Sequence, residues 1–400
     1  MTKISEQFIR KIPKTDLHLH LDGSLRLPTL IEMAKADKVK LPSSTEAGLN
    51  KLVFKPRYEN LGEYLTGFAF TVAVLQTPEH LERAAFELAE DAFEEGVRYI
   101  EIRFAPQLHI SRSHEIEPVV LAVFQGLEKA KKHLNASMAE NDLPFEYGII
   151  LCAMRRFNRH MSPYYARLFA RAGNSGPRYI FARASLGLVK EAVRLRDKGL
   201  PIVGFDLAGE EAGYPAAHHL EAFDYAHKHF LRKTVHAGEA YGPESIFQAI
   251  TECHANRIGH GTFLFSEEAI KLKSIKDKKT YIEQLAEYIA NQRIMIEVCP
   301  TSNLQTIPEI KSMENHPLQQ MVDNGLSVTI NTDNRLVSHT SVTNELLLCT
   351  TQIDLTDSQF RDLVLAGFKR SFFPRPFAEK RQYVMRAIQR YDELAEQYLT

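Results

Sequence analysis

Short apolar runs alternate with segments of helical spacing along almost the whole chain of 400 residues. The clearest helical segment covers 78–93, where apolar residues recur on one face. Thr77 can cap its start and Gly96 can close its end. The apolar or alternating runs between such segments predict strands at 16–23, 98–106, 147–154, 202–209, 234–238, 256–261, 294–300 and 327–334.

Strands that alternate with helices predict a parallel sheet with helices outside it. Eight repeats of the unit predict an α/β fold of the closed (β/α)8 TIM barrel type, with an open doubly wound sheet as the alternative. The connection 24–97, after the first strand, is long enough to need extra helices. No repeat, low-complexity segment or linker divides the chain, so we expect 1–400 to form one domain.

An enlarged, arginine-rich excursion follows the third strand and covers residues 155–185. No Asp or Glu occurs between 147 and 190. We interpret it as a helical excursion whose arginines pair with acidic neighbours or a second subunit. A phosphate or nucleic-acid patch is the alternative, which the lack of an aromatic-interleaved motif disfavours. The arginines are Arg155, Arg156, Arg159, Arg167, Arg171, Arg178 and Arg183.

The formal net charge of −1 gives no reason to expect nucleic acid or an anionic membrane as a partner. No apolar run approaches the roughly 20 residues needed to span a bilayer. The N-terminal stretch is polar where a signal peptide would be apolar, so we expect a cytoplasmic protein. The four cysteines show no CxxC spacing, so neither a disulfide framework nor a thiolate zinc site is expected. The oligomeric state stays open.

Two histidines, His18 and His20, lie two positions apart in the first predicted strand. Because strand side chains alternate, both project to one face, where about 7 Å of strand separates them and they can converge on one ion. An HxH pair alone is weak evidence, since two such histidines can simply be hydrogen-bonded. The evidence becomes stronger because the carboxyl ends of all the strands of a parallel barrel lie at one face. Three other strands end in polar residues: His236 with Glu239, His260, and Asp333 with Asn334.

Imidazole and carboxylate ligands suit zinc, and an open coordination position lets bound water ionise near neutral pH. We therefore expect one zinc ion per subunit, while nickel, cobalt and iron stay compatible with the ligand types. Glu239 follows His236 by three residues and is placed to act as an acid, and His260 is free to act on the water. The alternative for Glu239 is a carboxylate at a helix N-terminus formed by the next residues, Gly-Pro-Glu-Ser.

Taken together, these segments resemble the adenosine deaminase branch of the amidohydrolase superfamily, from about Lys14 to the last helix. The matching stretches, in the family's order, are HLHLDGSLR, YIEIRFAP, CAMR, GFDLAGEE, HAGE, RIGHG, EVCPTSN and NTDN. The resemblance implies a hydrolytic deaminase of purine metabolism whose partner is a small purine nucleoside. It also implies four zinc ligands: His18, His20, His236 and Asp333.

In the mechanism that the resemblance implies, Glu239 protonates N1 of the purine while His260 and Asp333 orient the water that adds to C6. Protonation in step with addition suits this chemistry, because attack on C6 breaks the conjugation of the ring. Asp22 would accept from the ribose 5′-hydroxyl, and Gly209 would present its backbone N–H to N3. Phe68 and Met154 are as readily explained as core residues. The implied substrate contacts are His20, Asp22, Gly209, Asn334, Leu61, Tyr64, Phe68 and Met154.

Asn334 departs from the family's pattern, in which many members carry a second aspartate that contacts N7. N7 of adenine accepts hydrogen bonds. A carboxyl group must be protonated to donate one, whereas an amide donates at any pH. We expect Asn334 to contact the base, with a shifted substrate preference as the alternative.

Asp22 bears on the substrate, because a carboxylate accepts from a 5′-hydroxyl but repels a 5′-phosphate. Members of the adenine-specific branch, as the resemblance implies, tend to carry Glu there. Both points favour adenosine and 2′-deoxyadenosine. The alternatives are a deaminase of adenine or a modified aminopurine nucleoside, and a non-catalytic purine-binding member. A non-catalytic member should have lost ligands or the acid, and none of these is missing from the sequence.

Overall fold

Eight parallel strands in sequence order form the centre of the computed structural model, which describes residues 4–110 and 115–399. Each strand pairs with the next one along the chain. The strands are β1 (Lys14–His20), β2 (Val97–Phe104), β3 (Glu146–Met154), β4 (Ile202–Ala208), β5 (Arg232–Ala237), β6 (Arg257–His260), β7 (Met295–Val298) and β8 (Val328–Ile330).

The sheet closes where β1 meets the segment that follows β8. Leu19 and Asp333 form an isolated parallel bridge. The N–H of His20 donates to the carbonyl of Asp333 at 2.8 Å, and the N–H of Asp333 donates to the carbonyl of His18 at 2.8 Å. The (β/α)8 TIM barrel predicted from the sequence is confirmed, and each of the eight predicted strands overlaps an observed one.

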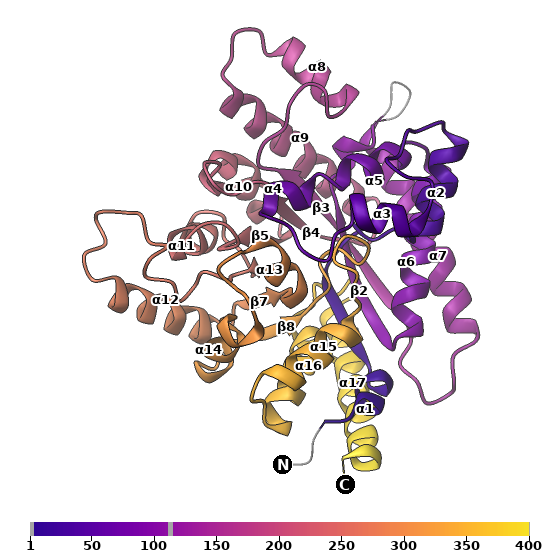
Figure 1. Ribbon diagram of the computed structural model, residues 1–400, viewed down its shortest axis with the longest axis vertical. Helices are drawn as coiled ribbons and strands as arrows, with labels where there is room; N and C mark the ends of the chain where they lie inside the picture. Colours follow the sequence, from indigo (N-terminus) through magenta and orange to yellow (C-terminus); the bar gives the residue numbers. More distant parts are fainter. Residues whose placement is uncertain (1–3, 111–114, 400) are drawn as a thin grey trace.

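Helices surround the barrel and fill the two enlarged connections (Figure 1). Those before β4 are α1 (Glu6–Lys11), α2 (Leu27–Ala36), α3 (Glu46–Leu52), α4 (Leu61–Leu65), α5 (Phe68–Val74), α6 (Pro78–Glu94), η1 (Pro106–Leu108), α7 (Ile116–Ala136), α8 (Pro163–Arg171) and α9 (Pro177–Asp197). Those after β4 are η2 (Ala216–His219), α10 (Leu220–Lys228), α11 (Pro243–Thr251), α12 (Lys278–Gln292), α13 (Pro300–Thr306), η3 (Met313–Asn315), α14 (Leu318–Asp323), α15 (Val342–Gln352), α16 (Asp357–Arg370) and α17 (Phe377–Tyr398).

The helix predicted at 78–93 is confirmed as α6, and Thr77 caps it by accepting from the N–H of His80. The extra helices expected after the first strand are α2 to α5. The excursion after the third strand is confirmed as α8 and α9, which extend beyond the barrel at the top of Figure 1. Both enlarged connections leave the barrel at the carboxyl ends of strands, which is the face where the polar strand ends gather.

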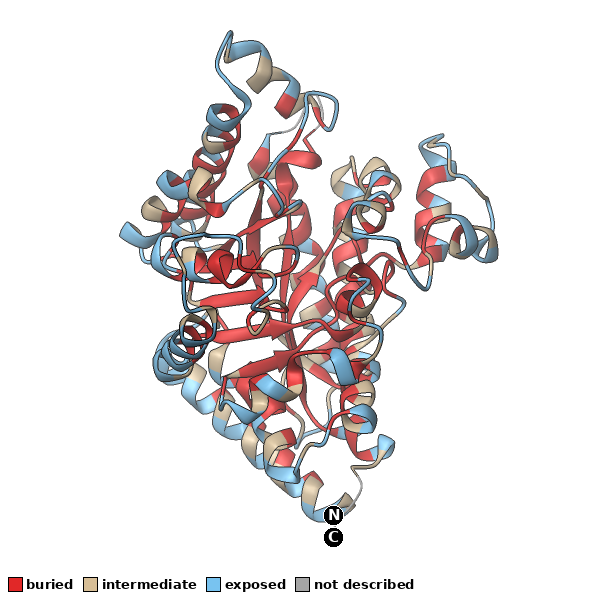
Figure 2. Ribbon diagram, turned by 60° about the vertical axis from the view of Figure 1, so that its left-hand side comes forward, coloured by how far each residue is buried: buried red, intermediate tan, exposed pale blue. Residues whose placement is uncertain are grey.

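The strands are buried on both sides, and exposed residues lie on the outer helix faces (Figure 2). In β1, Leu17 and Leu19 are fully buried on one face, whereas Asp16 and His18 are fully buried on the other. This alternation follows from the pleat of a strand. The apolar face contributes to the main core, and the polar face of β1 therefore supplies the barrel interior with chemical groups.

The arginines of the excursion do not form one patch. Arg156 pairs with Glu210 at 2.7 Å, as expected for an arginine beside an acidic neighbour. Arg155 is instead fully buried and donates to the carbonyls of Tyr214 and His236. By donating to the carbonyl of His236, Arg155 supports the backbone of β5. The arginine-rich sequence around Arg155 did not indicate this role.

All four cysteines are buried and free. Within 4–110 and 115–399, no helix has both the length and the apolar character that crossing a bilayer requires.

Candidate active site

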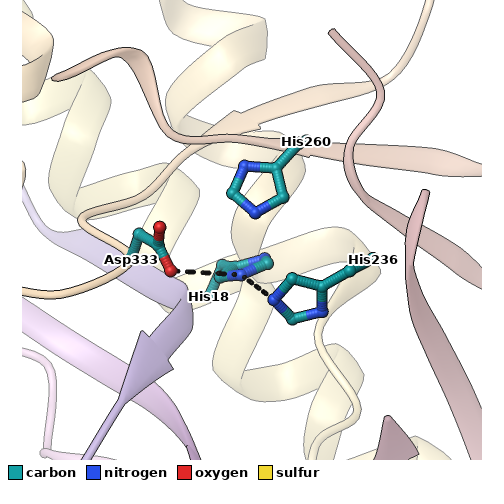
Figure 3. Close-up of side chains that lie close together, drawn as sticks. All are labelled: His18, His236, His260 and Asp333. Atoms are coloured by element: carbon teal, nitrogen blue, oxygen red, sulfur yellow. Dashed lines mark hydrogen bonds and ion pairs between the residues drawn. The ribbon is translucent and has the colours of Figure 1, made fainter. Parts of the chain in front are cut away.

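Four side chains meet at the carboxyl ends of β1, β5 and β8. Nε2 of His18 lies 3.0 Å from Nε2 of His236. Nε2 of His20 lies 3.2 Å from the same atom. Oδ1 of Asp333 lies 3.5 Å from Nε2 of His18 and 3.5 Å from Nε2 of His20. Figure 3 shows Asp333, His18 and His236 joined in a row, with His260 set apart from them.

The donor set fits a cation. Nδ1 of His18 faces Oε2 of Glu297 at 2.8 Å, and Nδ1 of His236 faces Oδ2 of Asp206 at 3.1 Å. Because carboxylates only accept, both Nδ1 atoms carry the proton, and the two Nε2 lone pairs point at one spot. Ligand atoms about 2.0–2.1 Å from zinc at tetrahedral angles lie about 3.3–3.4 Å apart, which is close to the observed separations. Lone pairs crowded in this way repel one another unless a cation lies between them.

Burial and neighbouring charges hold the ligand histidines in different states. Burial, with the cations around them, lowers the pKa values of His18 and His20 well below the ordinary value, so both rings are neutral and able to bind metal. Burial also disfavours the charged form of His236, but the carboxylate of Asp206 outweighs it and raises the pKa of His236. Asp206 therefore makes the ring of His236 the most basic of the three.

A buried ion network supports these residues from inside the barrel. Arg103 of β2 donates to Asp206 at 2.9 Å and to Glu297 at 2.8 Å. All three side chains are fully buried. Removing one partner of such a network would leave an uncompensated charge in the interior. Arg103 therefore holds in place the two carboxylates that orient His18 and His236.

Two residues of the site have left-handed backbone conformations. The φ angles of His260 and Asp333 are 64° and 62°, in a region that residues other than glycine seldom adopt. Both residues directly follow or end a strand, where the backbone must turn to bring the side chain over the barrel. Such conformations persist only where surrounding contacts enforce them, and they cluster at functional sites.

Gly259 leaves space for a ligand ring. A Cβ atom at this position would lie 2.9 Å from Cε1 of His18 and 3.2 Å from Cα of His236. Both distances are shorter than ordinary carbon contacts, and the second is to backbone that cannot yield easily. The glycine of the RIGHG motif therefore allows β1 and β5 to bring their histidines together.

Glu239 lies beside these ligands as a buried carboxyl group. Its Oε1 is 3.7 Å from Nε2 of His260. Burial raises the pKa of Glu239 to about 8, helped by the nearby charges of Asp333 and Glu211, so that it is mainly protonated at neutral pH. The alternative that Glu239 caps a helix is wrong, because α11 begins at Pro243 with Gly242 as its N-cap. Glu239 is thus available as a proton donor.

Glu211 shapes the loop that carries Glu239. Its carboxylate accepts the backbone N–H groups of Gly238 at 2.9 Å, Glu239 at 3.0 Å and Ala240 at 2.7 Å. Three donors on one buried carboxylate hold the loop in a single conformation. Glu211 therefore positions Glu239 and also contributes to its raised pKa.

A chain of hydrogen bonds sets the tautomer of His260. The N–H of Leu318 donates to Nδ1 of His316 at 3.1 Å, so Nε2 of the neutral His316 ring carries the proton. That atom donates to Oδ1 of Asn303 at 3.2 Å, and Nδ2 of Asn303 donates to Nδ1 of His260 at 3.2 Å. Burial lowers the pKa of His316 to about 3, which keeps that ring neutral. Nε2 of His260 consequently carries a proton and faces the site as a donor.

Replacing Asn303 by aspartate should reverse this tautomer, because a carboxylate accepts a proton from Nδ1 of His260 where the amide donates one. We expect Asn303→Asp to lower kcat by about tenfold or more with zinc content unchanged, since an orienting donor would become an acceptor. NMR of the histidine ring nitrogens would report which nitrogen is protonated. Asn315→Asp, the same substitution at an exposed position whose Oδ1 accepts from Ser312, is the control. Unchanged kcat and an unchanged tautomer in Asn303→Asp would contradict the prediction.

Two of the predicted substrate contacts, Asp22 and Gly209, come after strands of the barrel. Asp22 is buried just beyond β1. Gly209 follows β4 with a φ of 95°, and a Cβ there would lie 3.4 Å from Cε of Met154. Leu61, Phe68 and Met154 are only half-buried and pack against the core clusters.

Asn334 already has a partner within the protein. Its Nδ2 donates to the hydroxyl of Tyr64 at 2.8 Å, and that hydroxyl contacts Oγ of Ser338 at 2.8 Å. The contact ties α4 to the loop after β8. One amide hydrogen of Asn334 is thus used by Tyr64, and the side chain also hydrogen-bonds Asp333 beside it.

The sequence interpretation missed several residues that support the site. All but His316 lie within a motif that was quoted only for its resemblance, and for Arg103, Asp206 and Glu297 the available signal was a charge in the middle of a strand. These residues are Arg103, Asp206, Glu211, Glu297, Asn303 and His316.

Comparison with known proteins agrees with this arrangement. The family model described as adenosine deaminase matches residues 13–176 and 181–390. The chain belongs to the adenosine deaminase family. As a member of it, the protein is a hydrolytic deaminase. It is 36% identical over 368 residues to adenosine deaminase of Mycobacterium avium, covering 92% of each chain. It is 35% identical over 368 residues to adenosine deaminase 1 of Streptomyces coelicolor, covering 92% of this chain and 84% of that one.

Three solved structures share the fold of this adenosine deaminase family member. Adenine deaminase from Arthrobacter aurescens has a TM-score of 0.74 at 21% identity, covering 96% of this chain and 99% of that one. Arabidopsis N6-mAMP deaminase has a TM-score of 0.72 at 25% identity, with the same coverage of 96% and 99%. A Burkholderia ambifaria amidohydrolase with bound zinc has a TM-score of 0.78 at 18% identity, covering 100% and 95%.

Proposed function

We propose that this protein deaminates adenosine and 2′-deoxyadenosine to inosine and 2′-deoxyinosine, with release of ammonia and with zinc as its metal. The observation that carries the proposal is the convergence of three histidine Nε2 atoms and one carboxylate oxygen, each of which lies 3.0 to 3.5 Å from two of the others. The protonated carboxyl of Glu239 beside them supplies the acid that a purine substrate requires.

Four side chains would hold the zinc ion: His18, His20, His236 and Asp333. When bound, zinc lowers the pKa of a water molecule so that it can attack at neutral pH. Glu297 and Asp206 keep the ring nitrogens of His18 and His236 correctly protonated for this ligand set. A zinc-bound amidohydrolase with the same fold is compatible with this choice of metal.

The chain's own residues would then move the protons. Glu239 donates its proton to N1 of the purine, which makes C6 more electrophilic. Of the two protons of the water that adds to C6, one passes to the amino group, which leaves as ammonia when its bond to C6 breaks, and the other returns to the carboxylate of Glu239. His260 directs its Nε2–H at the oxygen of the attacking water, in the orientation that Asn303 enforces. Asp333, one of whose oxygens accepts from Ser302 at 2.7 Å, keeps its other oxygen toward the histidines and helps to orient the same water.

The remaining contacts would orient the nucleoside. Gly209 presents its backbone N–H to N3, Asp22 accepts from the ribose 5′-hydroxyl, and Asn334 donates an amide hydrogen to N7. His20, at the edge of the metal site, also borders the substrate. The apolar walls would come from Leu61, Tyr64, Phe68 and Met154.

Adenosine is favoured over related substrates for two reasons. The relatives at 35% to 36% identity are named adenosine deaminases. The buried carboxylate of Asp22 disfavours a 5′-phosphate, although the N6-mAMP deaminase shares the fold. Adenine is the second candidate substrate, because the adenine deaminase also shares the fold.

Turnover of zinc-loaded protein with adenosine, 2′-deoxyadenosine, adenine and AMP would test the proposal. We expect ultraviolet absorbance changes and ammonia release with the first two substrates and much slower reaction with the others. Turnover of adenine alone would identify the second candidate. If zinc-loaded protein leaves all four unchanged, the proposed function is wrong.

A further inference from the structure

Two buried polar side chains face each other near the ligands and lack hydrogen-bond partners. Asp22 and His109 are 4% and 1% exposed. Neither Oδ1 of Asp22 nor Nε2 of His109 has a partner among residues 4–110 and 115–399. Nε2 of His109 lies 3.7 Å from Oδ2 of Asp22, which is too long for a hydrogen bond. Buried polar atoms left in this state cost free energy unless a ligand group completes them.

The ring of His109 is held in one orientation. The residue follows η1, directly after β2, and its Nδ1 lies 2.9 Å from the carbonyl of Leu75. A carbonyl only accepts, so Nδ1 carries a proton and Nε2 is the nitrogen left to meet a ligand. The Phe104 ring, with its centroid 6.0 Å away, packs on the side of the imidazole. Leu75 and Phe104 therefore hold the ring so that Nε2 points toward the carboxylate of Asp22.

We propose that His109 is a specificity-determining residue of the substrate site, and that it reads a ribose hydroxyl together with Asp22. This inference rests on the proposed function. Nε2 of His109 and Oδ2 of Asp22 are both acceptors, and they lie 3.7 Å apart. Two neighbouring hydroxyls of one ribose can therefore each donate to one of them.

The chemistry of the pair selects a hydroxyl. With Nδ1 protonated toward Leu75, Nε2 of the neutral ring can only accept, so one ribose hydroxyl can donate to Asp22 while a second donates to Nε2. The ligand must therefore bring O–H groups. A phosphate dianion brings none and meets the negative charge of Asp22. Asp22 and His109 therefore recognise a nucleoside and exclude a nucleoside 5′-phosphate.

Two variants separate the ligand contact of His109 from its structural contact. In His109→Asn, the amide can replace Nδ1 toward the carbonyl of Leu75 but leaves nothing at the place of Nε2. In His109→Gln, the longer amide reaches the place of Nε2 but loses the contact with Leu75. We expect His109→Asn to lower kcat/KM for adenosine by about tenfold or more, and His109→Gln to recover most of it. Zinc content and Tm would confirm that both variants fold.

Substrate analogues decide the assignment. The loss in His109→Asn should disappear with 5′-deoxyadenosine or with 3′-deoxyadenosine, because one of them lacks the hydroxyl that His109 contacts. Equal losses on adenosine and on both analogues, or no loss on adenosine, would overturn the role of His109 alone. Inactivity of the zinc-loaded wild-type protein toward adenosine would overturn the proposed function and this assignment with it.

Discussion

Glu239→Gln is expected to keep its zinc and its fold but to lose nearly all turnover of adenosine. Glutamine has almost the same shape as a protonated glutamic acid, so the buried site receives no new charge and no cavity. It cannot release a proton to N1, however, and the addition of water to C6 would then have to place negative charge on the ring. General acid catalysis contributes typically about 10²–10⁴-fold, and we expect a loss in kcat of at least that size.

Glu210→Gln is the matched control for this variant. Glu210 lies in the same GFDLAGEE segment as Glu211, but its side chain is 47% exposed and pairs with Arg156 at the surface. We expect its kcat to match that of the wild type. Zinc content, Tm and kcat measured together would separate loss of the acid from loss of the fold. Near-normal turnover in Glu239→Gln would remove Glu239 from the role of acid.

Removing the metal is expected to abolish activity and to lower Tm by several degrees. Without a cation, the Nε2 lone pairs of His18 and His20 each face Nε2 of His236 and the carboxylate of Asp333 across 3.0 to 3.5 Å. A ligand at 1,000 times its Kd stabilises the native state by about 4 kcal/mol, which is a large part of the stability of a protein. We expect zinc added to chelated protein to restore both activity and Tm.

A ligand variant and a control make this test specific. His236→Asn should show no rise in Tm on addition of zinc, because it removes the nitrogen shared by two of the short contacts. His219→Asn alters another buried histidine, whose Nδ1 contacts Oγ of Ser185 at 2.7 Å, and should respond to zinc as the wild type does. Metal analysis should find one ion per chain. A chelated wild-type protein that keeps its Tm and its activity would refute the metal site.

The barrel was predictable because its signal is local. In a strand or a helix, buried residues recur with the period of the pleat or of the helical turn. The eight strands could therefore be located from the sequence alone. Their ends were less predictable. The strand predicted at 16–23 ends at His20, and the strand predicted at 327–334 ends at Ile330. Where a strand ends depends on hydrogen bonds to neighbouring strands that are far away in the sequence. The apolar periodicity of the strand itself contains no information about these bonds.

The groups that could bind metal were also recognisable, because HxH alternation and the polar strand ends follow from the geometry of any parallel barrel. Their supporting residues were not. Asp206, Glu297 and Asn303 gain their roles only from contacts with histidines on other strands. The sequence pattern of a polar residue in a strand is the same whether its side chain faces a ligand, an ion pair or water. The sequence alone therefore could not assign a role to these residues.

What the sequence by itself determined was the order of the elements, the face on which the chemistry gathers and the residue types present there. The tertiary structure decided which atoms meet. It protonates Glu239 by burying it, turns the Nε2–H of His260 toward the site and brings Nε2 of His109 to within 3.7 Å of Asp22. The physical reason is that pKa values and hydrogen-bond partners depend on distances across the barrel, which exist only after the strands have packed.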